Sequence, residues 1–316
     1  MASFRQHGNG WQGRIRRRGY PDITKTFETK ADAEKWARAL ESEIDKGQFV
    51  NVSEAQRNTL GDLIARYLAE VTPSMKGASE DTIRLKAMMR RPIARWSMAN
   101  LSAARIAGYR DERLKEVSSG TVIRELAYLS AIINHARREW GINIPNPVQM
   151  VRKPQSPQAR ARVLNDEEVA KLLQALEPAG RRNHWTKPIV QLALATAMRR
   201  GELLSLRWEN IDLIGRTAFL SDTKNGDSRT VPLSTTAVQV LAGLPRHISG
   251  LVFPVKAFTV DAAFKRGLRR ANLVGIRFHD LRRTAITRMA EKLPNVIELA
   301  AVSGHKSLMV LKRYYC

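Results

Sequence analysis

Six residues in the C-terminal half have side chains that together could transfer a phosphoryl group to a tyrosine. In chain order they are Arg199, Lys224, His279, Arg282, His305 and Tyr314. Two guanidinium groups can bind the non-bridging oxygens of a charged phosphorus transition state. A lysine can protonate the leaving oxygen, and a phenol becomes a nucleophile beside a base or a cation. Because this chemistry requires neither a metal ion nor a cofactor, we expect none.

Each of these residues alone has a simpler structural explanation. Arg199 and Glu202 are three residues apart, and such pairs are mostly found on solvent-exposed helix surfaces. A lysine at a hairpin tip is usually solvated, and an isolated His-x-x-Arg pattern is common. Tyr314 and Tyr315 could be ordinary aromatic anchors of a last helix. It is the ordered set, with Glu202 placed to hold Arg199, that favours catalysis over packing.

The charge balance favours a nucleic-acid partner. The 316 residues include 53 Lys and Arg against 30 Asp and Glu, which gives a formal charge of +23. Solubility alone does not explain such an excess, whereas a polyanionic partner does. We expect no membrane association, because the sequence has no apolar run of bilayer-spanning length and no basic amphipathic helix with an apolar underside.

A cytoplasmic protein of two or more domains is expected. The N-terminal segment MASFRQHGNG lacks the apolar core of a secretory signal. The single cysteine, Cys316, excludes an intrachain disulfide and a cysteine-based zinc site. A hydrophobic content of 43% is sufficient for sizeable cores, and the length predicts more than one of them.

Residues 1–55 are predicted to form a small DNA-binding module. Alternating residues at 11–19 and 24–29 predict two paired strands, and the apolar spacing at 30–47 predicts a helix across them. A strand face rich in arginine can enter a DNA groove. The candidate DNA-contacting residues of this module are Arg14, Arg16, Arg17 and Arg18.

Residues 56–150 are predicted to form a helical domain. Helices are expected at 59–71, 80–96, 102–117 and 119–141. Thr59 with Asp62 predicts a capping box at the first of them, and Pro92 predicts a bend or break in the second. The fourth helix has an apolar stripe typical of a core. Its outward arginines are candidates for phosphate contacts: Arg124, Arg137 and Arg138.

A basic linker at 151–165 is expected to join this domain to a catalytic domain at 166–316. The candidate DNA contacts of the linker are Arg152 and Lys153. The Asn225–Gly226 pair predicts a hairpin within 217–234. Helices are expected at 234–243, 259–271, 279–291, 295–302 and 307–314, the last capped by Ser307. The predicted fold class is therefore mainly α with small β elements (α+β), with a mixed α/β catalytic domain.

The ordered residues resemble the active-site signature of the tyrosine recombinases, also called phage integrases. That signature runs Arg, Lys, His-x-x-Arg, His or Trp, Tyr. The matching positions are Arg199 in TAMRRGEL, Lys224, His279, Arg282, His305 in SGH, and Tyr314. Tyr314 follows His305 by nine residues, the family's usual interval, so it is favoured over Tyr315 as the nucleophile. Glu202 matches the acidic residue that supports the first arginine.

The resemblance covers most of the chain. Residues 11–44 resemble the arm-binding module of some phage and genomic-island integrases. The segment TVIRELAYLSAIINHARREWG resembles the last helix of the family's SAM-like core-binding domain. The stretch from REWGI through NPVQMVRKP, together with SGHKS and LKRY, resembles the shufflon-type recombinases in particular. The implied architecture is an arm-type module, a SAM-like domain and a tyrosine recombinase catalytic domain.

The resemblance implies a site-specific recombinase of mobile elements that cuts and rejoins double-stranded DNA. The implied reaction passes through a 3′-phosphotyrosyl link and a Holliday junction in a homotetramer on DNA. It implies that Arg199, Arg282 and His305 stabilise the transition state. Lys224 would protonate the leaving oxygen, and His279 is a candidate acid or base. An accessory DNA-bending protein is a candidate further partner.

Three features depart from the family's pattern. Ala197 stands where Gly is usual, and Arg283 stands where His often follows the second catalytic arginine. The sequence ends two residues after Tyr314, whereas members usually continue into a C-terminal helix or tail that docks on a neighbouring protomer. This ending suggests a shortened chain. Two alternatives stay open: a type IB topoisomerase-like strand-passage enzyme, and a non-catalytic sequence-specific DNA-binding protein.

Overall fold

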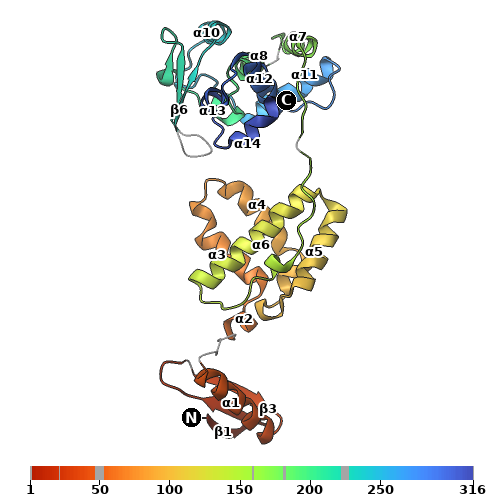
Figure 1. Ribbon diagram of the computed structural model, residues 1–316, viewed down its shortest axis with the longest axis vertical. Helices are drawn as coiled ribbons and strands as arrows, with labels where there is room; N and C mark the ends of the chain where they lie inside the picture. Colours follow the sequence, from red (N-terminus) through yellow and green to blue (C-terminus); the bar gives the residue numbers. More distant parts are fainter. Residues whose placement is uncertain are drawn as a thin grey trace. The chain divides into compact units, whose positions relative to one another are not determined.

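The chain folds into two compact units, each described here by itself (Figure 1). They are Met1–Gln158 and Ala159–Cys316. The computed structural model describes residues 2–20, 22–46, 53–158, 160–180, 183–221 and 228–315. Both units consist mainly of helices, and each contains a small three-stranded sheet, so the mainly α class with small β elements is confirmed. In the described part of the chain, no helix combines the length and apolar character needed to cross a membrane.

The first unit begins with an antiparallel sheet covered by one helix. These elements are β1 (Ala2–His7), β2 (Gly10–Ile15), β3 (Ile23–Phe27) and α1 (Lys30–Asp45). The helix packs so closely on β2 that a Cβ on Gly13 would lie 3.1 Å from the Trp36 ring. The sequence predicted β2, β3 and α1. It missed β1, because residues 2–7 contain only one large apolar side chain, that of Phe4.

The following part of the first unit is helical. Its α-helices are α2 (Ser53–Arg57), α3 (Leu60–Glu70), α4 (Ala78–Met89), α5 (Ala103–Glu116) and α6 (Ser119–Glu139), and its 3-10 turns are η1 (Thr72–Ser74), η2 (Pro92–Arg95), η3 (Met98–Asn100) and η4 (Pro147–Met150). The predicted capping box is present, with Thr59 and Asp62 each bonding the other's backbone N–H. The predicted break is also present, because α4 ends at Met89, before Pro92.

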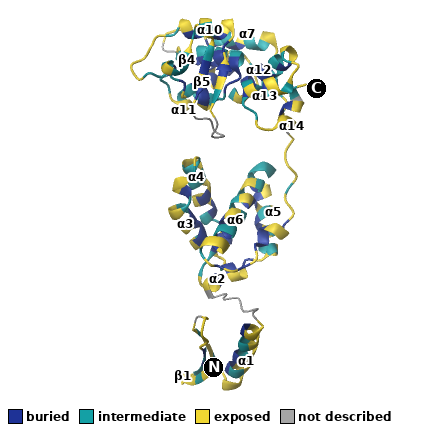
Figure 2. Ribbon diagram, turned by 60° about the vertical axis from the view of Figure 1, so that its left-hand side comes forward, coloured by how far each residue is buried: buried dark blue, intermediate teal, exposed yellow. Residues whose placement is uncertain are grey.

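Helix α6 forms the centre of this helical core. Its predicted apolar stripe is fully buried, at Val122, Leu126, Leu129, Ile133 and Ala136. The buried residues lie on the faces that α3, α5 and α6 turn toward one another, and the exposed residues lie outside (Figure 2). The buried apolar side chains of this helical part therefore form one continuous hydrophobic core.

The second unit surrounds helix α8 with helices and places a small sheet at one side (Figure 1). Its elements are α7 (Asp166–Ala175), α8 (Thr186–Thr196), α9 (Arg200–Leu204), η5 (Trp208–Asn210), β4 (Ile211–Asp212), β5 (Thr217–Leu220), β6 (Arg229–Pro232), α10 (Thr235–Ala242), α11 (Ala257–Arg270), α12 (Phe278–Lys292), α13 (Val296–Ser303), α14 (Leu308–Leu311) and η6 (Lys312–Tyr314). β5 and β6 pair as the predicted hairpin. Its predicted Asn225–Gly226 turn lies outside the described residues.

We predict that Leu129→Ala destabilises the helical part of the first unit by about 2–5 kcal/mol, because Leu129 is completely buried in α6 and its truncation leaves a cavity. Urea unfolding followed by circular dichroism measures the change. Ile83→Ala is the matched control, because Ile83 is 70% exposed on α4. Equal losses for the two variants would contradict the assignment of α6 as the centre of the core.

Candidate active site

The first predicted arginine lies at the junction of two helices. α8 ends in the left-handed residue Ala197, and α9 begins at Arg200, so Arg199 occupies the N-cap position. Glu202 accepts hydrogen bonds from the Arg199 backbone N at 2.8 Å and from its Nη1 at 2.7 Å. Arg199 Nη2 donates to the carbonyl of Gly304 at 3.1 Å. Arg199 is therefore fixed from two sides.

The second arginine, Arg282, comes from α12 and is only 3% exposed. Its Nη1 donates to the carbonyl of Ala197, and its Nη2 donates to the carbonyl of Ser303 at 2.6 Å. Burial, followed by the positive charge of Arg199, lowers the pKa of Arg282 to about 10. The guanidinium therefore stays protonated at neutral pH.

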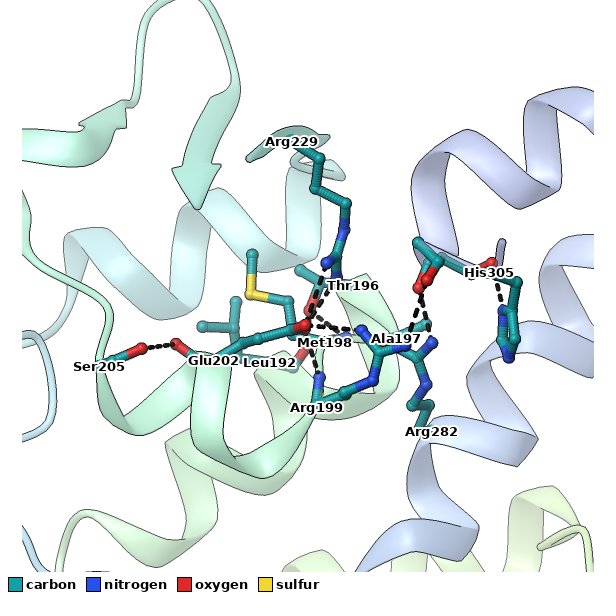
Figure 3. A network of polar contacts seen from close by, with 12 residues as sticks. Leu192, Thr196, Ala197, Met198, Arg199, Glu202, Ser205, Arg229, Arg282 and His305 are labelled. Atoms are coloured by element: carbon teal, nitrogen blue, oxygen red, sulfur yellow. Dashed lines mark hydrogen bonds and ion pairs between the residues drawn. The ribbon is translucent and has the colours of Figure 1, made fainter. Parts of the chain in front are cut away.

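The two guanidinium groups converge on one place (Figure 3). Arg282 and Arg199 bind the carbonyls of the consecutive residues Ser303 and Gly304, although they are 83 positions apart in the sequence. His305 follows directly on the same segment. The structure thus brings together Arg199, Arg282 and His305. The two adjacent guanidinium groups form a positively charged site whose chemistry suits a phosphate.

The hydrogen bonds of Ser303 fix the tautomer of His305. Ser303 is completely buried, and its Oγ donates to the carbonyl of Leu299 at 2.6 Å. The hydroxyl has a single proton, so its 2.8 Å contact with His305 Nδ1 requires that Nδ1–H donates to Oγ. In the neutral imidazole, the other nitrogen, Nε2, then carries no proton.

Both histidines of the site are neutral at neutral pH. Burial, followed by the charge of Arg282, lowers the pKa of His305 to about 4. Burial, followed by the charge of Arg282, also lowers the pKa of His279. A neutral imidazole can accept a proton, so each of these side chains is available as a base in the unliganded protein.

The end of the chain places Tyr314 beside this cluster. Its ring centroid lies 6.3 Å from that of His305, and Arg283 Cζ lies 5.8 Å from the Tyr314 centroid. Tyr315 differs, because its hydroxyl donates to the carbonyl of Leu293 at 2.9 Å. Tyr315 is therefore an anchor of the last turn, while Tyr314 adjoins the polar residues.

Helix α14 departs from the expectation both in its cap and in its length. Ser307 occupies the N-cap position of α14, but its side chain makes no capping hydrogen bond, so the predicted cap was wrong. Helix α14 is also shorter than predicted and continues as the 3-10 turn η6. Lys224, predicted as the general acid, lies outside the described residues. Within the described residues, no group of three or more His, Cys, Asp or Glu could hold a metal ion.

One site residue, Arg229, was missed by the sequence analysis. Its Nη1 and Nη2 donate to Glu202 Oε1 at 3.0 Å and Oε2 at 2.7 Å. Burial alone would raise the pKa of Glu202, but hydrogen bonds from Arg229 and Arg199 outweigh it and lower the pKa to about 2. No spacing rule links Arg229 to Glu202, so the contact has no sequence signal.

Comparison with known proteins establishes the family. The sequence matches the phage integrase family over residues 162–316 and the phage integrase N-terminal domain over residues 56–154. It is 40% identical to the shufflon-specific DNA recombinase of Escherichia coli, over 82% of this chain and 69% of that protein. The chain belongs to the phage integrase family.

Solved structures show that this integrase-family chain shares the fold of lambda integrase. A lambda integrase (75–356) dimer bound to a core site has a TM-score of 0.69 at 22% identity, over 82% of this chain and 95% of that one. A lambda integrase tetramer bound to a Holliday junction has a TM-score of 0.66 at 21% identity, over 97% and 95% of the two chains. At these identities the similarity concerns the fold.

The predicted DNA-contacting residues of this family member fall into two groups. In the N-terminal module, Arg14 and Arg16 share Asp22, and Arg17 pairs with Asp45. The others are exposed: Arg18, Arg124, Arg137, Arg138, Arg152 and Lys153. Arg137 and Arg138 also line a surface hollow of about 380 Å³ together with Asn134 and Asn143. Three arginines of the N-terminal module therefore already bind carboxylates, but Arg16 and Arg17 are exposed as well, and ion pairs at an exposed surface are weak.

We predict that nitrogen-15 NMR of histidine-labelled protein shows His305 as the Nδ1–H tautomer at neutral pH, with a protonation midpoint near pH 4. Ser303→Ala removes the acceptor of the Nδ1 proton, so the Nε2–H tautomer becomes populated. Ser249→Ala, which removes the exposed partner of His247 Nδ1, is the matched control and leaves the His305 signals unchanged. An Nε2–H signal for His305 in the unmodified protein would refute the deduced tautomer.

Proposed function

We propose that this protein is a site-specific DNA recombinase in which Tyr314 forms a 3′-phosphotyrosyl link to the cut strand. The observation that carries this proposal is the binding of Arg282 and Arg199 to the carbonyls of Ser303 and Gly304. These two residues directly precede His305, whose ring lies beside that of Tyr314. This arrangement holds two cations and a phenol around one place. A scissile phosphate there would contact both guanidinium groups.

The bound phosphate would also change the charge of His305. Its pKa is about 4 in the free protein, because the site is buried and already contains cations. A phosphodiester brings negative charge, which raises the pKa of a nearby imidazole. His305 then takes up a proton at Nε2 while Nδ1–H remains bonded to Ser303. In this form Nε2–H can donate to a non-bridging oxygen, as Arg199 and Arg282 do.

Cleavage is a displacement at phosphorus. The bond between Tyr314 Oη and phosphorus forms while the bond from phosphorus to the 5′-oxygen breaks. The phenol proton passes to a neutral imidazole, for which His279 is the candidate. The leaving 5′-oxygen takes a proton, for which Lys224 is the candidate donor. Because the phosphotyrosyl bond conserves the energy of the phosphodiester, the 5′-hydroxyl of a partner duplex can reverse the step without a cofactor.

The remaining parts of the molecule are assigned to DNA binding. We assign residues 1–55 to an arm-type module, 56–150 to the core-binding domain, 151–165 to the linker and 166–316 to the catalytic domain. Strand exchange requires partner copies, and the lambda integrase tetramer bound to a Holliday junction supports a homotetramer on DNA. Because the substrate is DNA and the 40% identical relative is bacterial, we place the protein in the bacterial cytoplasm.

We predict that Tyr314→Phe abolishes the covalent protein–DNA adduct, because it removes the only oxygen that attacks phosphorus. The substrate is a nicked duplex whose recognition sequence the protein has first selected from random DNA. The adduct is measured on a denaturing gel. The adjacent variant Tyr315→Phe is the matched control, because that hydroxyl serves an anchoring hydrogen bond, and it retains adduct formation within about threefold. Undiminished adduct with Tyr314→Phe would rule out this nucleophile.

A further inference from the structure

Arg229 begins β6, the second strand of the β5–β6 hairpin, and its side chain reaches back into the arginine cluster. It is the first residue of β6, and its side chain is only 12% exposed. Both terminal nitrogens bind Glu202, one to each carboxylate oxygen. Such a bidentate contact fixes the orientation of the carboxylate as well as its position.

Glu202 is shared between two arginines and is fully occupied by them. Oε1 accepts from Arg199 Nη1 at 2.7 Å and from Arg229 Nη1 at 3.0 Å. Oε2 accepts from the Arg199 backbone N at 2.8 Å and from Arg229 Nη2 at 2.7 Å. Because Glu202 is 5% exposed, water cannot easily replace a lost donor, and a buried carboxylate with fewer donors would shift to a new pose.

Arg229 also contacts the turn at Gly304, whose carbonyl accepts the second hydrogen bond from the Arg199 guanidinium. A Cβ added to Gly304 would lie 2.8–2.9 Å from the Cζ, Nη1 and Nε atoms of Arg229. Gly304 has φ +67, and its carbonyl accepts from Arg199 Nη2. Arg229 thus contacts both groups that hold Arg199, which are Glu202 and the Gly304 turn. Figure 3 shows its guanidinium directed at Glu202.

We propose that Arg229 is a positioning residue for the recombination reaction: it holds Glu202 and the Gly304 turn in the pose that aims Arg199 at the scissile phosphate. This proposal rests on the proposed function of the same site. Arg229 acts through Glu202, because Nη1 and Nη2 both donate to that carboxylate and the side chain is only 12% exposed. Its position on β6 also joins the hairpin to the arginine cluster.

The test compares Arg229→Met, Arg229→Lys, Glu202→Gln and the double variant Arg229→Met/Glu202→Gln on the selected nicked duplex. Single-turnover adduct formation at saturating DNA gives the rate, and gel shifts give Kd. We expect Arg229→Met to lower the rate about 100-fold with Kd nearly unchanged, because a misaimed catalytic group costs rate. Lysine keeps the positive charge but cannot make the paired contact. The rate of Arg229→Lys should therefore lie between the rate of Arg229→Met and that of the unmodified protein.

The double variant separates positioning from direct contact with DNA. If Arg229 acts through Glu202, Arg229→Met costs less than about threefold once Glu202 is already Gln. The double variant also leaves no buried carboxylate short of hydrogen-bond donors. We therefore expect it to fold even if Arg229→Met alone lowers the melting temperature. Arg207→Met is the matched control, because it removes an arginine of a half-exposed ion pair with Glu209 and leaves the rate unchanged.

Three results would overturn the inference: an unchanged rate with Arg229→Met, a loss that appears in Kd alone, or losses that multiply fully in the double variant. Each of these would leave the proposed function intact, provided the unmodified protein still forms its adduct. If the unmodified protein forms no adduct on any selected duplex, the proposed function fails and the positioning role fails with it.

Discussion

Two arginines of like charge lie side by side in this protein because the end of one helix supplies acceptors for both. α13 ends at Ser303, and the last carbonyls of a helix have no intrahelical partners. Arg282 and Arg199 donate to the carbonyls of Ser303 and Gly304. The partial negative charge of the helix C-terminus offsets part of the repulsion between the guanidiniums. The Glu202 carboxylate, which binds Arg199, offsets a further part. A bound phosphate would add negative charge to a cluster that remains cationic, and this excess of positive charge favours its binding.

Backbone strain at the same place has a structural reason. Ala197 is fully buried and has φ 54, a left-handed conformation that costs an L-residue roughly 1–2 kcal/mol. This explains why Gly is usual at the position. The turn at Ala197 ends α8 and allows its carbonyl to accept from Arg282, while Arg199 begins the next helix. The strained residue Ala197 therefore affects both arginines: its carbonyl binds Arg282, and its turn sets the direction of the chain that leads to Arg199.

The sequence predicted those features that depend on local chemistry. The capping box at Thr59 and the break at Pro92 follow from neighbouring residues, and the ordered signature led to the arginine cluster. Strands β1 and β4 were missed, because they are short and are stabilised by pairing with distant residues. Arg229 and Ser303 were missed for a related reason. Their roles depend on contacts with Glu202 and the His305 ring, which only the folded chain brings about.

The departure at Arg283 changes the charge beside Tyr314, the nucleophile that we propose. Where the family often has His, this chain has a permanent cation 5.8 Å from the Tyr314 ring centroid. A cation there attracts the ring, and in the proposed reaction it would stabilise the negative charge that develops on the phenol oxygen during attack. Burial, the charge of Arg282 and then the charge of Arg283 lower the pKa of His279. The same guanidinium therefore helps to keep the His279 imidazole unprotonated, as a proton acceptor must be, but it also opposes the positive charge that the imidazole gains when it takes a proton. In the proposed reaction, the negative charge of a bound phosphodiester would offset that opposition, so the substrate itself would make His279 a better base.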